Sequence, residues 1–299
     1  MTELKKDKTD RKYKKARFRG GKINRSLGAD IVIFAGLIVF GCFMALPLVY
    51  AIGNSLKPLN ELWVFPPMLI PRHPTFQNFI DLFSLLQNSW VPISRYFFNT
   101  LFITLVGTAG QVIFASACAY PLAKHKFPGH NFIFSMIVLS LMFSTVVTSI
   151  PNYIIMTELN WIDRYVAIII PAMGNSLGLY LMKQNIETLP DSLLEAAKID
   201  GANEFVIYWK IVMPNVKAAW LTLIVFSVQQ LWNTGSNIFI YSEQLKTLPY
   251  AISQILAGGI ARAGVGSAVT VIMMFVPIAV FVFTQSSIVE TMASSGMKD

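Results

Sequence analysis

Six long stretches of the chain contain no Asp, Glu, Lys or Arg, and no other feature limits the possible folds as strongly. They cover residues 31–53, 97–120, 132–157, 165–182, 218–241 and 265–289. Each is 18 to 26 residues long, close to the ~20 residues with which an α-helix crosses a bilayer. A transmembrane β-barrel would instead show ~10-residue segments of alternating hydrophobicity. The stretches therefore predict an all-α, polytopic membrane protein with six transmembrane helices.

The composition also argues against chemistry within this chain. Only 13% of the 299 residues are charged, about half the ~25% of a soluble domain. Cys42 and Cys118 lie in charge-free stretches and are interpreted as packing residues. His73, His125 and His130 lie in loops, without the spacing of a metal site or a catalytic triad. The chain has no G-x-x-x-x-G-K-[ST] phosphate loop, so we expect no catalytic residue, metal or cofactor of its own.

The distribution of basic residues predicts the orientation. Residues 1–29 contain eleven Lys and Arg, and basic residues beside a span stay on the cytoplasmic side. With six crossings, the expected cytoplasmic segments hold 18 Lys and Arg and the outer segments hold 6. We therefore expect both termini in the cytoplasm. The expected parts are a basic N-terminal arm (1–29), a six-helix transmembrane domain (30–289) and a tail (290–299).

The net charge of +8 is concentrated in the arm. Topology setting and attraction to the headgroups of anionic membrane lipid account for it, so no nucleic-acid partner is expected. A regulatory or partner-binding arm is the alternative. The apolar run that follows is longer than the h-region of a signal peptide and lacks a small-x-small cleavage site. We therefore expect it to remain as the first span.

Proline and glycine divide the chain further. The predicted outer loop 54–96 contains six prolines, and apolar residues within it recur at helical spacing. They predict a short amphipathic helix over 76–86, lying against the membrane surface or the outer ends of the spans: Phe79, Leu82, Phe83 and Leu86. Breakers inside the predicted spans are Pro47, Pro151, Pro171, Gly174, Gly178 and Pro277. Interrupted helices are common in transporters, although Pro and Gly occur in any membrane helix.

Polar side chains gather in the fourth and fifth predicted spans. Such groups are costly in lipid, so we expect them to face other helices or a wet cavity. Neutral amides and hydroxyls beside an aromatic ring suit a sugar, whereas ions would require charged groups. We interpret these residues as candidates for a substrate pathway: Asn175, Ser176, Gln229, Gln230, Trp232 and Asn233. Hydrogen bonding between helices without a solute is the alternative.

The predicted cytoplasmic loop 183–217 has the pattern of two short helices. Ser192 and Glu195 have the spacing of a capping box at the first helix, and Gly201 suits the left-handed residue that ends it. Asn203 can cap a second helix. The expected apolar face of the second helix is Phe205, Tyr208, Trp209 and Val212. So short a first helix is marginal alone and requires a docking surface on this protein or on a partner.

The same loop resembles the EAA motif of the membrane subunits of ABC importers. Glu195-Ala196-Ala197 is followed after three residues by Gly201, and after nine more by Ile211-Val212-Met213-Pro214, with Met213 where the pattern has Leu. Further segments resemble the maltose-type, carbohydrate-uptake group: Leu189-Pro190, Ile199-Asp200-Gly201-Ala202, Ala119-Tyr120-Pro121-Leu122-Ala123-Lys124 and Phe127-Pro128-Gly129.

This resemblance implies a coupling function for the loop, which in this family docks into a cleft of a separate ATPase that binds ATP and Mg. The residues it assigns to coupling are Glu195, Ala196, Ala197, Asp200, Gly201, Ile211 and Pro214. The implied partners are a second homologous membrane subunit, two ABC ATPase subunits and an extracytoplasmic solute-binding protein. The solute-binding protein would meet the outer loop 241–264.

The sequence therefore predicts a permease subunit, in the cytoplasmic (inner) membrane, of an ABC importer for a sugar or oligosaccharide. ATP hydrolysis is left to the partner subunit. An importer of peptides or amino acids is the main alternative. An ion-coupled secondary transporter and a polytopic membrane enzyme are disfavoured, because each would require ionisable groups within the spans.

Overall fold

The computed structural model describes residues 27–87, 91–235, 238–259 and 262–295. Most of the predicted basic arm (1–26) and the end of the predicted tail (296–299) therefore lie outside the described residues. Helices and loops, and no strand, make up the residues that are described. The chain divides into two compact units, residues 1–50 and 51–299, which are treated separately below.

The first unit contains most of one long helix, α2 (Leu27–Ser55), whose last turn falls in the second unit. Its 29 residues correspond to about 44 Å at ~1.5 Å per residue, enough to cross the ~30 Å hydrocarbon core. Pro47 lies inside this helix without ending it. The first predicted span is thus confirmed as a helix of sufficient length and apolarity.

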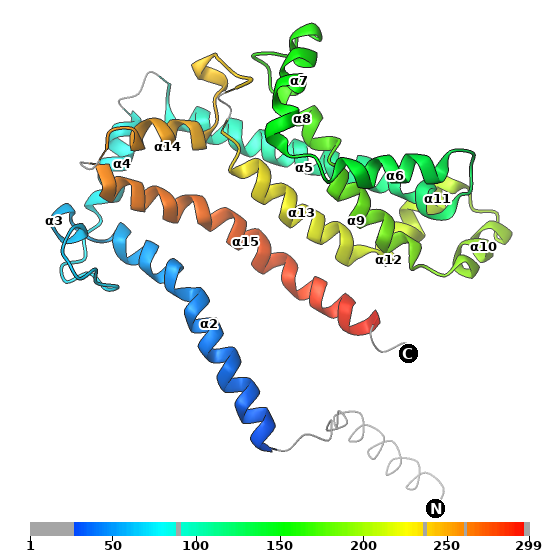
Figure 1. Cartoon of the computed structure of the whole chain (residues 1–299), viewed down its shortest axis with the longest axis horizontal. Coiled ribbons are helices and arrows are strands. Elements are labelled where there is room, and N and C mark those ends of the chain that lie inside the picture. Colours follow the sequence, from blue (N-terminus) through cyan, green and yellow to red (C-terminus); the bar gives the residue numbers. More distant parts are fainter. Residues whose placement is uncertain (1–26, 88–90, 236–237, 260–261, 296–299) are drawn as a thin grey trace, which may run out of the picture. The chain divides into compact units, whose positions relative to one another are not determined.

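The second unit carries the remaining helices, and Figure 1 shows α4 and α14 at one end of it and α10 at the other. They are α3 (Leu59–Leu62), α4 (Gln77–Gln87), α5 (Ile93–Lys124), α6 (His130–Ser140), α7 (Thr145–Glu158), α8 (Val166–Met173), α9 (Ser176–Glu187), α10 (Asp191–Ile199), α11 (Glu204–Ile207), a π-helix (Tyr208–Val212), α12 (Met213–Asn215), α13 (Lys217–Trp232), a 3₁₀ turn (Glu243–Leu245), α14 (Leu248–Leu256) and α15 (Ala263–Ser295).

Three more predicted spans contain helices of sufficient length. The second and sixth are the single helices α5 and α15, of 32 and 33 residues. The fourth consists of α8 and α9, which together satisfy the length and apolarity of a span over Val166–Glu187. They are interrupted where Gly174 N–H donates back to the Pro171 carbonyl and Asn175 caps α9.

The third and fifth predicted spans differ from the structure. The third is two helices, α6 and α7, separated at residues 141–144, where Ser144 caps α7 through the Val146 N–H. In the fifth, α13 ends at Trp232 rather than near residue 241. Asn233 and Thr234 end it because their side chains donate to the carbonyls of the last turn, Gln229 and Gln230.

The number of candidate spans is accordingly smaller than predicted. Among the described residues, four helices are long and apolar enough to cross a membrane. There are five if Glu204–Asn215 and Lys217–Trp232, bent by 78°, count as one. The chain is thus all-helical and polytopic over the part that is described, and six continuous crossing helices are not found there.

Helix α5 is the centre of the second unit, because α8, α9 and α13 all pack against it and α13 also packs against α15. The close approach of α9 depends on Gly178. A Cβ there would lie 2.9 Å from Leu223 Cδ1 and 3.2 Å from Gln111 Nε2. Gly178, predicted above as a helix breaker, therefore lies inside an intact helix and allows three helices to pack together.

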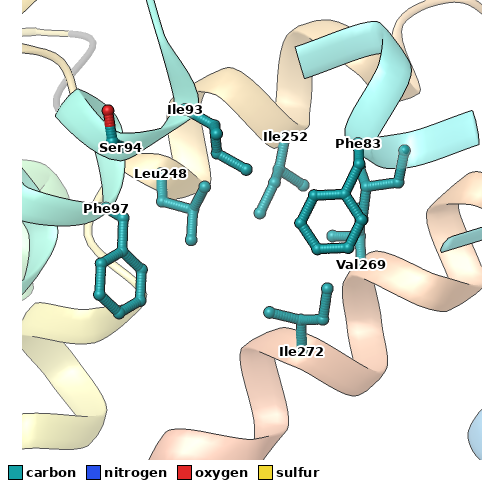
Figure 2. A pocket seen from close by; sticks show the side chains of 9 residues that line it. Phe83, Ile93, Ser94, Phe97, Leu248, Ile252, Val269 and Ile272 are labelled. Atoms are coloured by element: carbon teal, nitrogen blue, oxygen red, sulfur yellow. The ribbon is translucent and has the colours of Figure 1, made fainter. Parts of the chain in front are cut away.

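The short helix predicted over 76–86 is confirmed as α4. Leu82 on its apolar face is only 2% exposed and packs with residues of α14 and α15, in agreement with a helix lying against the ends of spans, whereas Phe83 of the same face is 48% exposed. A cavity of about 320 Å³ lies beside it, between α4, α5, α14 and α15. Figure 2 shows its lining of apolar side chains, with the Ser94 hydroxyl at its edge. Such a lining offers little to a sugar.

The bond between Trp232 and α15 links the last two long helices. Pro277 lies inside α15 and has no N–H, so it cannot donate to the carbonyl of Met273, four residues earlier. Trp232 Nε1–H donates to that carbonyl at 3.0 Å instead. The indole is 1% exposed and meets the Phe97 ring edge-on at 6.2 Å. A neighbouring helix thus satisfies the carbonyl that proline leaves unpaired.

We predict that Trp232→Phe destabilises the protein by about 1–3 kcal/mol, because it leaves a buried carbonyl without a donor. The measurement is the thermal unfolding midpoint of the detergent-solubilised protein. In a Pro277→Ala background, residue 277 regains an N–H for Met273, so the same Trp232→Phe change should cost clearly less. Equal losses in the two backgrounds would contradict this role of the indole.

Candidate functional site

The polar residues of the fourth and fifth predicted spans meet where α8 gives way to α9. The Asn175 side chain accepts from Leu177 N–H at 2.9 Å and so caps α9. Its Nδ2 donates to Gln230 Oε1 on α13 at 3.3 Å. Ser176 accepts a hydrogen bond from Ser140, at the end of α6, at 2.6 Å. Three helix segments therefore contribute neutral amides and hydroxyls to one place.

The other predicted pathway residues differ in their positions. Gln229 and Asn233 are exposed on α13 and at its end, although the Asn233 amide donates to the Gln229 carbonyl at 2.8 Å. Trp232 is buried, and its ring and N–H are both engaged inside the protein. It is therefore not available to stack on a sugar, and that expectation is corrected: the indole stabilises α15.

The loop 183–217 contains two short helices, α10 and α11, as predicted. Gly201 between them has φ +80°, a left-handed conformation that glycine adopts without steric cost. Asn203 caps α11 by accepting from Val206 N–H at 2.8 Å. The capping box at Ser192 is wrong: α10 starts one residue earlier, at Asp191, with Pro190 as its N-cap and no side-chain cap.

The second helix of the loop is less regular than expected. Its chain passes into a π-helix over Tyr208–Val212. Because the π-turn rotates the face, Ile207, Tyr208 and Val212 are buried whereas Phe205 and Trp209 are exposed. The predicted four-residue apolar face is therefore wrong for Phe205 and Trp209. Both lie on the outside of the loop.

The residues of the EAA motif fall into an exposed and a buried group. Glu195, Ala196, Asp200 and Gly201 are exposed, and so is Pro214. Ala197 is buried in the hydrophobic core beneath α10, and half-buried Ile211 packs against the same core. One face of α10 thus anchors the loop to the rest of this chain, and the opposite face is free to be contacted.

The last turn of α5 holds the beginning of the loop. The Lys124 ammonium, itself buried, donates to the carbonyls of Glu187 and Leu189 at the end of α9 and to the Asp191 carboxylate at 2.8 Å. The hydrogen bond that Lys124 donates to Asp191 holds the pKa of that carboxyl below its ordinary value, and the positive charge of Lys124 adds a smaller effect in the same direction. One cation therefore joins α5, α9 and α10.

Glu204, the first residue of α11, holds the second helix of the loop. Its carboxylate accepts from Tyr120 OH on α5 at 2.7 Å and pairs with Lys198 of α10 at 2.7 Å. His125 Nε2 lies 3.7 Å from the same carboxylate. A buried bond of 2.6 Å between Ser116 and Tyr208 adds a third tie between α5 and the loop. The two short helices are thus fixed relative to each other and to α5.

A second constrained region lies towards the α14 end, where Asp163 joins two segments distant in sequence. Asp163 has φ +62°, a conformation in which Asp is among the tolerated residues. Its carboxylate accepts from the N–H groups of Tyr241 and Ser242 at 3.0 and 2.8 Å and from the Ser242 hydroxyl. Its own N–H donates to the Phe239 carbonyl at 2.8 Å. We call this set of four bonds the Asp163 clamp.

Sequence reasoning did not identify several of these residues. Lys124 and Tyr120 were named only as part of the segment that resembles the carbohydrate-uptake group, with no role of their own. Glu204 and Asp163 were not named at all. The available signal was modest: Glu204 directly follows a helix cap, and Asp163 lies in a very short loop. Asn99 was also missed, although it is a buried amide that binds the carbonyls of Gln244 and Lys246, both at 2.8 Å.

Long apolar helices, polar groups at interrupted helix ends and an anchored two-helix loop are features that a membrane transport permease would have. The chain belongs to the family of binding-protein-dependent transport system inner membrane components, whose model matches residues 37–292. The resemblance to ABC importer membrane subunits is therefore confirmed.

Individual relatives point in the same direction. Protein LplC of Bacillus subtilis (strain 168) is 31% identical over 223 residues, which cover 74% of this chain and 72% of LplC. The polygalacturonan/rhamnogalacturonan transport system permease protein YtcP of the same organism is 28% identical over 246 residues, covering 80% of this chain and 84% of YtcP.

A solved structure shares the fold. It is a bacterial ABC transporter involved in the import of the acidic polysaccharide alginate, and it matches with a TM-score of 0.72 at 22% identity. The match covers 88% of this chain and 98% of that one.

The Asp163 clamp gives a pH prediction. The Ser242 hydroxyl and the amides of Ser242 and Tyr241 hold the pKa of the Asp163 carboxyl below its ordinary value. The carboxylate form therefore stabilises the loop above the unfolded pKa of ~3.9, and this stabilisation is lost as the pH falls through the lower folded pKa. We expect hydrogen-exchange protection of the Tyr241 and Ser242 amides to disappear over that acidic range. Asp163→Asn should show weaker protection without a pH step, and a parallel fall in both proteins would contradict the assignment.

Proposed function

We propose that this chain is one membrane subunit of an ATP-driven ABC importer and forms half of the translocation pathway for a sugar or oligosaccharide. The observation that carries the proposal is the neutral polar cluster of Asn175, Ser176, Gln230 and Ser140 at the α8–α9 interruption. Amides and hydroxyls can donate to and accept from sugar hydroxyls. The relatives named above support a saccharide as cargo. Gln229 and Asn233, exposed on the same part of α13, extend the proposed pathway.

The proposed coupling site is the exposed side of the loop 183–217. Glu195 and Ala196 are exposed on α10, and Ile199, beside Asp200 and Gly201, is 87% exposed. This exposed side of the loop is the surface on which the proposed partner would dock. Ala197, Ile211 and Pro214 would hold the loop in place. The proposed partner is a pair of separate ATPase subunits that bind ATP and Mg.

The remaining partners and the orientation complete this proposal. A second homologous membrane subunit would supply the other half of the pathway, and an extracytoplasmic binding protein would deliver the solute at the α14 end. In the inner membrane, the basic arm would place both termini and the loop 183–217 in the cytoplasm. The chain would cross six times, with α6 and α7 together making the third crossing and α13 with its following segment the fifth.

The alternative is import of peptides or amino acids. Measuring the uptake of defined solutes distinguishes this alternative from sugar import. In the native host, uptake of radiolabelled maltotriose, arabinotriose, trigalacturonate and trialanine is compared between cells with and without the gene for this chain. We expect deletion to abolish uptake of at least one of the three sugars, and the gene supplied in trans to restore it. A loss confined to trialanine, or no loss for any sugar, would contradict the sugar assignment.

The coupling proposal is tested at Gly201. No atom lies within 4 Å of the position of an added Cβ, so a substitution acts through the backbone alone. Gly201→Val should disfavour φ +80° by about 1–2 kcal/mol or more, and reduce recovery of the ATPase with the affinity-purified permease about 5–30-fold. Gly201→Asn is the matched control, since Asn tolerates this conformation. Equal ATPase recovery with the Val and Asn variants would show that the elbow does not position the docking surface.

A further inference from the structure

Three aromatic rings lie together beside the Asp163 clamp. Tyr153, on α7, and Tyr241 share a hydrogen bond between their hydroxyls at 2.8 Å. The Tyr153 ring also lies almost parallel to the ring of Phe239, with 6.4 Å between centroids and 23° between planes. Tyr241 is 56% exposed, and Tyr153 and Phe239 are half-buried. We call these three residues the aromatic platform.

The platform is held in a fixed conformation before any ligand arrives. The Asp163 clamp holds this segment through three bonds to the backbone of Phe239, Tyr241 and Ser242 and one to the Ser242 hydroxyl. Between the two aromatic residues, Ile240 is fully buried and anchors the segment in the core. Phe239 and Tyr241 therefore lie on a short segment that the clamp and Ile240 hold in one conformation. Because this segment is already ordered, binding a ligand costs less conformational entropy.

The platform and the polar cluster are built from the same parts of the chain. Gln230 of the cluster is on α13, and the segment that follows α13 carries Phe239 and Tyr241. Ser140 of the cluster ends α6, and the next helix, α7, carries Tyr153. The two sites are thus contributed by the same two stretches of the chain, and two of the three platform residues lie in the connection between α13 and α14.

We propose that the aromatic platform is a saccharide-binding subsite at the outer mouth of the pathway, with a ring of an oligosaccharide stacked on Tyr241. This inference rests on the proposed function. Aromatic side chains offer large, rigid surfaces that match the C–H face of a sugar ring. The two hydroxyls add polarity: one donates to the other, so the second keeps its own proton and both keep acceptor capacity for sugar hydroxyls.

The chemistry of the platform favours a sugar over a charged or purely apolar ligand. Both oxygens of Asp163, the carboxylate that contacts this segment, already accept hydrogen bonds.

A membrane anchor and a latch are the two competing roles for these tyrosines. Tyr residues at a membrane interface can act as anchors, and the hydroxyl–hydroxyl bond could serve as a latch between α7 and the loop. An anchor affects the amount of protein in the membrane, whereas a latch depends on the hydroxyls and not on the rings.

The experiment measures the KM and maximal rate of uptake in native cells for whichever of maltotriose, arabinotriose and trigalacturonate the wild type imports. We expect Tyr241→Leu to raise KM about tenfold with little change in maximal rate per molecule of permease. Tyr241→Phe, which keeps the ring, should raise it about threefold or less. Trp63→Leu is the matched control, because Trp63 is similarly exposed at 60% but belongs to the segment after α3.

The outcomes separate this inference from the function on which it rests. If the wild type imports none of the three sugars, the proposed function fails and the subsite fails with it. If it imports one and Tyr241→Leu leaves KM unchanged, only the subsite is overturned. Equal effects of the Leu and Phe variants would favour the latch, and a lower amount of protein at unchanged KM would favour the anchor; either result overturns the subsite.

Discussion

The hydrogen bond from Trp232 to the Met273 carbonyl shows the constraint on which this fold depends: within a membrane, each backbone carbonyl requires a donor from the protein itself. Pro277 removes one donor from α15, and the indole of α13 replaces it. Asn99 likewise donates to the carbonyls of Gln244 and Lys246, in the irregular segment between α13 and α14. Side chains with N–H groups are therefore placed where the backbone departs from regular helix, and they fix how neighbouring helices meet.

The same constraint explains where the candidate pathway lies. A helix that begins or ends among other helices exposes amides and carbonyls that polar side chains must satisfy. Asn175 caps α9 with its oxygen and still offers its nitrogen to Gln230, while Asn233 and Thr234 end α13 close to that residue in sequence. Broken helices thus concentrate polar groups that a continuous span would exclude. The concentration of amides and hydroxyls there is a consequence of the breaks.

Sequence reasoning predicted the helical membrane class, the family, the elbow at Gly201 and the cap at Asn203, because charge-free length and local turn chemistry are visible along the chain. It failed where distant segments decide the outcome. The break between α6 and α7 carries no proline, so composition does not reveal it, and the π-helix at Tyr208–Val212 rotated a predicted apolar face. Trp232 looked like a sugar platform only because its partner, 41 residues away, is invisible in the sequence.

Helix α5 joins the two ends of the second unit without interruption. At one end Asn99 binds the segment that leads to α14, and at the other Tyr120 and Lys124 bind both halves of the loop 183–217. Its 32 residues extend over about 48 Å. A stiff rod attached at both ends transmits a tilt directly. If the loop is the coupling site proposed above, its displacement would move the opposite end of α5 in the same step, with no chain of intermediate side-chain rearrangements to carry the signal.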